Sequence, residues 1–452
     1  MTEQQGPATG GQGGVTGGRR PVTGGQGPVP GGEDPRAATR GPGPLRLFRF
    51  LIYGLVLASS AAQYAVVPIL PVYAHRFGLS GLQQGMVLGA TGLATLAVSL
   101  PAGALSDRFG ARRLTLWAGW LMAAALLAQA LAGSFPVLLA ARLGFGVGFA
   151  MVWTAGLSWL TEAAPGGPGL GGTVASAGAG GVVGPALAGV AVQYFGLVSP
   201  FLAVAAGFAV LTLGLGLLRV RAVAPAPSAP MGTSLRAATA DRRTIVAAAA
   251  IVIAGGTTGV SALLVPAGLH AAGAAPGQIG LVFAAAGVLF VVASTLTTAA
   301  GRRAVCMPVV MAGMLALALG VSPAIVTAAP FALVAMQCAT TAARSVLWTV
   351  SYPLAAAGSE RSGAGLGVVM GLLNGVWAAT VLLGPLAAGL AADRLSAQAV
   401  FALTAVACLA VLAITVLVAG PLRRPARVAC VPGDDLIPGR EQLPSRGRRG
   451  NG

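Results

Sequence analysis

The chain has 452 residues, of which 56% are hydrophobic and only 9% are charged, and its mean hydropathy is +0.81. This composition excludes an ordinary soluble protein and indicates a membrane protein. The formal net charge is +17, and all 28 basic residues are Arg. A charge of this size also suits nucleic-acid binding, but the placement of the Arg residues argues against that class, as described below.

Twelve apolar segments are long enough to cross a bilayer as helices, since a span needs about 20 residues. The segments are too long and too uniformly apolar for the strands of a barrel. The sequence therefore predicts an all-α membrane protein with twelve transmembrane helices. The expected spans are 47–73, 82–105, 114–132, 136–160, 171–194, 198–218, 244–268, 278–299, 304–320, 325–350, 364–390 and 398–418.

All but four of the Arg residues lie in segments that share one side of the membrane when the N-terminus is placed in the cytoplasm. Arg76 and Arg394 fall on the other side, and Arg142 and Arg344 lie within spans. Positive loops resist translocation, so both termini are expected to be cytoplasmic. The expected contacts of this charge are membrane lipids with anionic head groups, and no nucleic-acid partner is expected. Arg without Lys, with abundant Ala, Gly and Pro, is typical of a GC-rich bacterial genome and favours a bacterial cytoplasmic membrane.

The chain divides at its polar segments. Residues 1–45 and 421–452 cannot bury a core and are expected to be disordered cytoplasmic tails. The first tail has no apolar signal-peptide core, so the first span is expected to direct insertion. Residues 219–243 carry several Pro and Arg and are expected to be a cytoplasmic linker. This division predicts one six-helix half over 46–218 and a second over 244–420.

The two predicted halves repeat each other in sequence. Constant shifts superpose prolines, glycines and the only two His residues of the chain. The pattern predicts two pseudo-symmetric halves arranged as a parallel repeat. The superposed pairs include Pro71 and Pro266, His75 and His270, Gly85 and Gly280, Gly92 and Gly287, Pro185 and Pro385, and Gly189 and Gly389.

The link from Gly103 to Arg113 reads Gly-Ala-Leu-Ser-Asp-Arg-Phe-Gly-Ala-Arg-Arg and concentrates charge between two apolar spans. Two membrane helices joined this tightly form a hairpin. The pattern resembles the signature loop between helices 2 and 3 of the major facilitator superfamily of transporters. The resemblance covers about residues 47–420. It implies two six-helix halves that work by alternating access, with the substrate site near the bilayer midplane between them.

The resemblance implies that the acid of this loop contacts the cytoplasmic start of helix 11, near Gly363–Gly367. An acid at a helix N-terminus gains about 0.3–1 kcal/mol. The alternative is a turn acid that only sets topology. The second half has Thr298 at the position of Asp107, so such a latch is one-sided. The residues of this conformational latch are Gly103, Asp107, Arg108, Gly110, Arg112 and Arg113.

Arg142 precedes spaced glycines in a pattern that resembles the helix-4 motif of the family. A charged Arg within a span costs about 2.5–3.5 kcal/mol, so it faces protein or water. The resemblance implies a role in proton transfer; the alternative is an Arg that binds backbone carbonyls. No Asp or Glu lies in the interior of a span. Protons as the coupling ion are therefore implied by the resemblance alone, with Glu162 as a candidate acid or simply a helix-end residue.

Helix 5 contains Gly180, Gly184, Pro185 and Gly189 at intervals that let helices approach closely and bend. This spacing resembles the helix-5 motif of antiporting exporters, including twelve-helix drug–proton antiporters. Ala188 departs from the motif, where a Gly is usual. Plain helix packing is the alternative in so Gly-rich a chain. The motif favours export over uptake.

Helix 10 places polar and aromatic residues along one face, namely Gln337, Thr341, Arg344 and Trp348. Arg344 lies near the middle of its span, and ionisable residues at that depth are functional by default. A guanidinium suits a carboxylate or phosphate, and Trp348 suits an apolar or aromatic body. The alternative is that Arg344 pairs only with polar neighbours inside the protein.

Further cavity candidates come from the helices that the resemblance places around the substrate. Each of them alone is more easily explained by packing. The candidates are Gln63 and Tyr64 on helix 1, Trp153 on helix 4, and Asn374 and Trp377 on helix 11, with Ser60, Thr257, Thr258 and Ser261 as weaker ones.

No phosphate-binding loop, metal-ligand cluster or activated nucleophile is present in the sequence, and the four Cys are scattered. We therefore expect no enzyme, no cofactor and no metal site. The predicted function is a secondary active efflux antiporter for a small amphipathic molecule, with an anionic one as the narrower case. The alternatives are an importer or facilitator of a small metabolite, and a membrane receptor or scaffold that kept the fold without transport.

Overall fold

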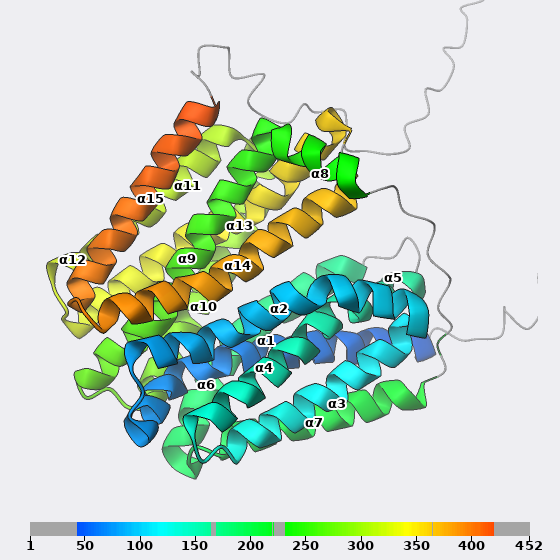
Figure 1. The fold of residues 1–452 in the computed structure, drawn as a ribbon, viewed down its shortest axis with the longest axis horizontal. Coiled ribbons are helices and arrows are strands. Elements are labelled where there is room, and N and C mark those ends of the chain that lie inside the picture. Colours follow the sequence, from blue (N-terminus) through cyan, green and yellow to red (C-terminus); the bar gives the residue numbers. More distant parts are fainter. Residues whose placement is uncertain (1–42, 164–168, 219, 221–230, 364, 420–452) are drawn as a thin grey trace, which may run out of the picture. The chain divides into compact units, whose positions relative to one another are not determined.

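The computed structural model describes residues 43–163, 169–218, 220, 231–363 and 365–419, and these residues form helices joined by short links (Figure 1). No strand is assigned within these ranges. The helices of the first half are α1 (Gly43–Phe77), α2 (Gly81–Phe109), α3 (Ala111–Ala130), α4 (Phe135–Met151), the π-helix η1 (Val152–Gly156), α5 (Leu157–Ala163), α6 (Gly169–Phe195) and α7 (Ser199–Leu217). Those of the second half are α8 (Met231–Ala240), α9 (Arg242–Ala271), α10 (Pro276–Ala299), the 3₁₀ turn η2 (Gly301–Arg303), α11 (Met307–Gly320), α12 (Ser322–Val326), α13 (Pro330–Ser362), α14 (Leu366–Ala392) and α15 (Ala397–Ala419).

Each of the twelve predicted spans contains a helix. The helix of the fourth span continues without a break through α4, η1 and α5. The ninth span contains α11, which begins at Met307. Among the described residues, nine helices are long and apolar enough to cross a membrane by length and composition. The helices α2, α3 and α13 are not among these nine, so the count of twelve membrane-spanning helices stays a prediction for them.

The predicted tails and linker lie largely outside the described residues. Residues 1–42, 221–230 and 420–452 lie outside the described part of the chain, so both tails stay predictions. The linker is partly helical, because α8 occupies its second part and packs against α9, α13 and α14. Asp241 then caps α9, accepting the backbone N–H of Arg243 at 2.9 Å and of Thr244 at 3.2 Å.

The signature loop is a very tight hairpin. Only Gly110 separates α2 from α3, and its φ of 87° lies in the region that favours glycine. The N–H of Gly110 donates to the carbonyl of Ser106 at 2.8 Å, which closes the end of α2. The hairpin that the sequence predicts at this point is thus confirmed.

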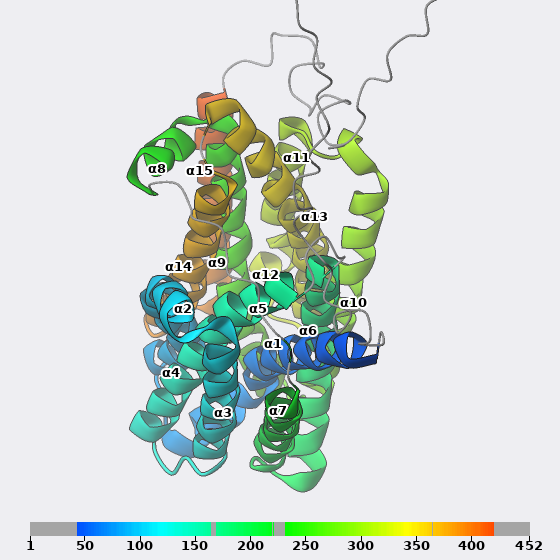
Figure 2. The ribbon, with the colours of Figure 1, turned by 90° about the vertical axis from the view of Figure 1, so that its right-hand side faces the viewer.

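Two helix pairs make the main contacts between the halves among the described residues, and each follows the sequence repeat. The helix α2 packs against α14, and α6 packs against α10 (Figures 1 and 2). A methyl group added at Gly85 would collide with the carbonyl of Pro385, and one added at Gly280 would collide with the carbonyl of Pro185. The superposed glycines and prolines therefore contact each other across the interface as two equivalent pairs.

These contacts lie toward one end of the helices. We name it the Asp393 end, defined by Gly81 and Asp393, and we name the opposite end, defined by Gly110 and Gly363, the Arg112 end. Along α14, a Cβ added at the three glycines nearest the Arg112 end meets nothing within 4 Å, whereas one added at the glycine nearest the Asp393 end collides with α2. The halves thus pack together at the Asp393 end, and α2 and α14 diverge toward the Arg112 end (Figure 1).

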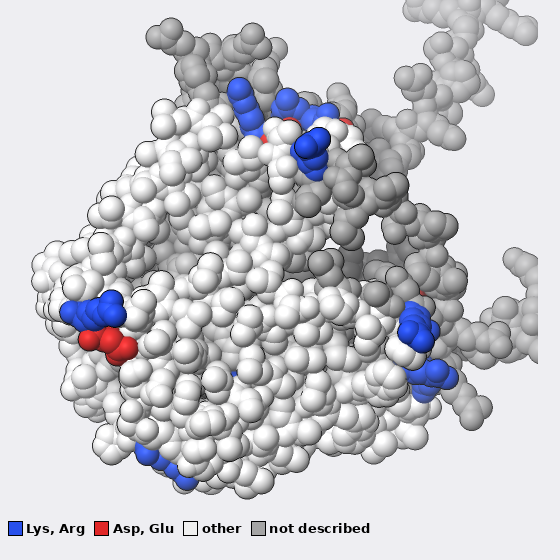
Figure 3. All heavy atoms as spheres, in the orientation of Figure 1, with Lys and Arg blue, Asp and Glu red and all other residues white. Residues whose placement is uncertain are grey.

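The outer surface is suited to lipid. On the face shown in Figure 3, charged side chains lie near helix ends and leave an uncharged band between them. Large apolar side chains are widely exposed among the described residues, for example Val326, Leu417 and Phe195 at 83%, 79% and 78%. Apolar exposure on this scale marks a membrane-facing surface.

Candidate functional site

The guanidinium of Arg344 is held by three hydroxyl groups. Its Nη1 donates to Oγ1 of Thr258 at 2.8 Å and to Oγ of Ser261 at 3.4 Å, and its Nη2 donates to Oγ1 of Thr341 at 2.5 Å. The side chain is 8% exposed. Within the described part of the chain no carboxylate contacts it, so these bonds position the cation without neutralising it.

Two of these hydroxyls donate their own protons to backbone carbonyls of α9. Thr258 donates its own proton to the carbonyl of Ala254 at 2.6 Å, and Ser261 donates to the carbonyl of Thr258 at 3.1 Å. The hydroxyl lone pairs therefore remain available for Arg344. Thr341 also accepts from Nε2 of Gln337 at 3.3 Å.

The amide oxygen of Gln337 is buried without a hydrogen-bond partner among the described residues. The helical spacing that we used to group Gln337, Thr341 and Arg344 thus corresponds to one connected polar row. All three side chains are buried.

Tyr64 is a first-half candidate whose electrostatic influence extends to Arg344. It is on α1 and is 36% exposed. Its ring also contacts α6, because a Cβ added at Gly181 would lie 3.7 Å from Cδ2.

An aromatic cluster continues from Arg344 toward the Arg112 end. The ring of Trp348 lies 5.3 Å from that of Tyr352 and 6.2 Å from that of Trp377, measured between centroids. The hydroxyl of Tyr352 donates to Oδ1 of Asn374 at 3.1 Å. These residues of α13 and α14, which we call the aromatic wall, begin one helical turn beyond Arg344.

Sequence reasoning named Trp348, Asn374 and Trp377 but missed Tyr352. The missing signal was present, since Tyr352 lies two turns after Arg344 and extends the same helical row. Two further candidates, Gln63 and Trp153, contact other residues of the first half, and their place in a cavity stays a prediction. Trp153 is on η1, where its ring lies 5.9 Å from that of Phe149.

Arg142 forms a second polar centre inside the first half. It is fully buried, and its Nε donates to the carbonyl of Val87 at 3.2 Å. Its Nη2 donates to Oε1 of Gln63 at 3.3 Å and to Oγ1 of Thr91 at 3.1 Å. No acid contacts Arg142 in the described ranges, and its Nη1 has no partner there.

Arg142 thus joins α4 to α1 and α2 through neutral acceptors. Gln63, which we expected in the cavity, is one of these acceptors. Glu162, the other residue considered for coupling, is half-buried on α5.

The latch residues are only partly described. Arg112 donates from Nη2 to the carbonyls of Gly216 at 2.7 Å and Leu218 at 3.4 Å, which anchors the loop to the end of α7. The guanidinium of Arg108 lies over the ring of Phe109 at 5.3 Å. The side chain of Asp107 lies outside the described part of the structure, so its contact with helix 11 stays a prediction.

The helix-5 motif lies on α6 and contacts two helices. A Cβ at Gly180 or Gly184 would collide with backbone carbonyls of α1, and one at Gly189 would collide with the carbonyl of Pro276 on α10. Pro185 contributes the carbonyl that lies against Gly280. The motif therefore serves close helix packing, within the first half and between the halves.

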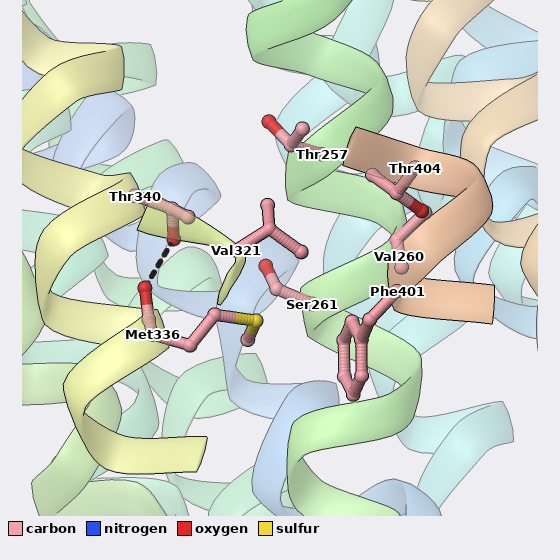
Figure 4. A pocket seen from close by; sticks show the side chains of 8 residues that line it. All are labelled: Thr257, Val260, Ser261, Val321, Met336, Thr340, Phe401 and Thr404. Atoms are coloured by element: carbon pink, nitrogen blue, oxygen red, sulfur yellow. Dashed lines mark hydrogen bonds between the residues drawn. The ribbon is translucent and has the colours of Figure 1, made fainter. Parts of the chain in front are cut away.

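A small cavity lies inside the second half (Figure 4). Its volume is about 10 Å³, which is room for about one water molecule. It is lined by Thr257, Val260, Ser261, Val321, Met336, Thr340, Phe401 and Thr404. Figure 4 shows the hydroxyl of Thr340 turned to the carbonyl of Met336, a bond of 2.7 Å. The cavity is too small for an organic substrate.

Comparisons with known proteins agree with this architecture. The family model described as Major Facilitator Superfamily matches residues 52–249. The chain is 32% identical over 155 residues to an uncharacterised MFS-type transporter, YuxJ, of Bacillus subtilis (strain 168). That match covers 32% of this chain and 39% of the curated relative, so it spans well under half of the relative's length.

Two solved structures share the fold. A bacterial homologue of the human lysosomal transporter Spinster, in an inward-facing and unoccupied conformation, has a TM-score of 0.67 at 16% identity, covering 84% of this chain and 97% of that chain. The nucleoside transporter NupG has a TM-score of 0.65 at 13% identity, covering 82% and 99%. The solved structures show the shared fold, and the family model over residues 52–249 makes the chain similar to transporters of the major facilitator superfamily.

Proposed function

We propose that the protein is a secondary active transporter that works by alternating access and exports a small amphipathic anion by antiport. The single observation that carries the proposal is the environment of Arg344. Its guanidinium is buried, hydrogen-bonded to three neutral hydroxyls, and free of any carboxylate contact in the described residues. Lipid contacts and a small-molecule substrate are part of this proposal, and no catalytic role is proposed.

An anionic substrate group matches this environment physically. A buried charge without a counter-charge is costly, and a carboxylate or phosphate would supply the missing charge with geometry suited to a guanidinium. The aromatic wall beside Arg344 supports an aromatic or apolar body for the rest of the substrate. Aromatic pairs contribute about 0.5–1.5 kcal/mol beyond the area they bury.

Alternating access is supported by the packing of the halves at one end only. We propose that the Asp393 end is extracellular and the Arg112 end cytoplasmic, because the Arg-rich segments gather at the latter. The structure would then be open toward the cytoplasm, with both termini on that side of a bacterial cytoplasmic membrane. Export is supported by the likeness of the helix-5 motif to that of antiporting exporters. Protons remain the proposed coupling ion through that same resemblance.

The main competing function is an importer or facilitator of a small metabolite. It is favoured by the sequence, since no Asp or Glu lies inside a span to carry a coupled proton. A receptor or scaffold without transport is the third possibility. Asp107→Asn separates it from both transporters, because loss of the latch should abolish flux and leave a scaffold unaffected.

The direct test is compound accumulation in a bacterial host that lacks its own exporters. Anionic, neutral and cationic amphipathic compounds would be compared in cells with wild-type protein, Arg344→Ala, or Arg394→Ala as an exposed control. Export of an anion predicts lowered accumulation that is lost in Arg344→Ala and kept in the control. Raised accumulation would establish uptake instead. Unchanged accumulation of every compound, in cells with correctly inserted protein, would refute transport of these compound classes.

A further inference from the structure

The start of α2 is capped by a residue from the other half of the protein. Asp393 ends α14 and lies 312 residues from Gly81 in sequence. Its Oδ1 accepts the backbone N–H of Gly81 at 2.6 Å, and its Oδ2 accepts the N–H of Leu82 at 3.0 Å. The carboxylate therefore makes two bonds to the same helix N-terminus.

These bonds complete a cap that the local sequence only begins. The first N–H groups of a helix have no partner within it. Ser80 and Gln83 form a capping box, in which Oγ of Ser80 accepts the N–H of Gln83 at 3.2 Å. Asp393 supplies acceptors for the two N–H groups that this box leaves open. Within the protein, the N–H groups of Gly81 and Leu82 have these acceptors only while the two halves touch.

The bonds are also electrostatically favourable. The N-terminus of a helix carries partial positive charge, and a carboxylate there gains from it. Hydrogen bonds to an ionised acceptor are about twice as strong as neutral ones. The contact lies at the Asp393 end, beside the close approach of Gly81 to Gly389. Figure 3 shows acidic and basic side chains side by side where α2 and α14 meet.

The sequence repeat supplies a natural comparison. The shift that superposes Gly389 on Gly189 places Gln193 at the position of Asp393. The amide of Gln193 lies against Gly277, at the start of α10. Pro276 occupies the position equivalent to Gly81 and has no backbone N–H to donate. Of the two equivalent interfaces, the one between α2 and α14 therefore carries the ionic cap.

We propose that Asp393 is a charged latch that holds the Asp393 end closed and thereby stabilises the state that is open at the Arg112 end. The latch forms a cross-half contact at the opposite end from the Asp107 loop. Rocking of the halves separates α14 from α2, which exposes the capped N–H groups and removes both bonds. The proposal goes beyond the proposed function, since it concerns conformation and holds for any substrate and either direction of transport.

The test measures distances at both ends by double electron–electron resonance in lipid nanodiscs. With the native Cys replaced, one spin-label pair is placed at Gly133 and Ala328 at the Asp393 end. A second pair is placed at Thr161 and Arg361 at the Arg112 end. All four positions are exposed. The variants are Asp393→Asn, Asp393→Ala and Asp393→Glu, and the matched controls are Gln193→Ala and Arg394→Gln.

Asp393→Asn and Asp393→Ala are expected to raise the population with long distances at the Asp393 end about tenfold relative to the closed one, equivalent to about 1.4 kcal/mol. The Arg112 end should close in the same variants. Asp393→Glu keeps the charge and should stay close to wild type, as should both controls.

Unchanged distributions in Asp393→Asn and Asp393→Ala would overturn the proposal. So would an equal shift in Gln193→Ala, or opening at the Asp393 end without closing at the Arg112 end. Should the Asp393 variants fail to give monodisperse protein, Gln193→Glu decides. The added charge faces the start of α10 and should lower the population with long distances at the Asp393 end. An unchanged population in Gln193→Glu would overturn the proposed latch. None of these outcomes depends on the accumulation assay, so the two proposals fail separately.

Discussion

Arg142 on α4 and Gln63 on α1 are joined by a hydrogen bond of 3.3 Å from Nη2 to Oε1. Arg142 is fully buried, and its other bonds go to the carbonyl of Val87 and the hydroxyl of Thr91 on α2. One cation therefore fastens three helices of the first half. Each of its partners among the described residues is neutral.

Replacement of Gln63 by Ala should destabilise the protein by about 1.5–3 kcal/mol, because it removes a partner from a buried charged donor. Unfolding in detergent by heat or denaturant measures the loss. Gln84→Ala is the matched control, since Gln84 donates to the carbonyl of Leu79 at 3.2 Å within its own neighbourhood. Equal losses in the two variants would show that Arg142 does not depend on Gln63.

Thr258→Val tests the positioning of Arg344. The change keeps the shape of the side chain but removes the acceptor that lies 2.8 Å from Nη1. A hydrogen bond to a charged group contributes about 1.5–3 kcal/mol, so the concentration for half-maximal transport of an anionic substrate should rise at least about tenfold. Thr295→Val is the control, because its hydroxyl binds only the carbonyl of Val291 in its own helix. Identical transport curves for the two variants would count against this role.

Trp348→Ala tests the aromatic wall. Loss of the ring removes the contacts with Tyr352 and Trp377 and the surface offered to a substrate. Aromatic anions should lose about 0.5–1.5 kcal/mol of binding beyond the area term, while aliphatic anions should lose less. Competition between the two kinds of anion for transport gives the ratio. Trp117→Ala, at a ring that is 51% exposed, should leave the ratio unchanged.

Gly85→Ala tests the close packing of the halves. A methyl group there would collide with the carbonyl of Pro385, whereas one at Gly207 would meet nothing within 4 Å. Replacing Gly by Ala in a helix usually gains up to about 1 kcal/mol, so Gly207→Ala should be neutral or stabilising. Gly85→Ala should instead weaken closure at the Asp393 end, since a backbone carbonyl cannot move aside easily. The same label pair at Gly133 and Ala328 measures the difference, and equal behaviour of the two variants would refute it.

Much of the architecture was predictable from local sequence. Apolar runs of sufficient length formed helices because a chain in lipid must satisfy its own backbone. The hairpin at Gly110 follows from the short charged link between two apolar runs, and the row of Gln337, Thr341 and Arg344 follows from spacing along one helix. Tyr352 was missed although it continues that row, because the predicted row ended at Trp348, one turn earlier.

The helices, the loop motif and the repeat are already encoded in the amino-acid sequence, since each depends on neighbours within one or two turns or on matching patterns. The hydrogen bond of Gln63 with Arg142 and the cap that Asp393 places on α2 depend instead on how the helices pack. These pairs join side chains from different helices. Which ends meet depends on the packing angle of whole helices and on the conformational state of the two halves. No local pattern encodes either quantity. The sequence around Asp393 therefore gives no sign that its side chain binds another helix.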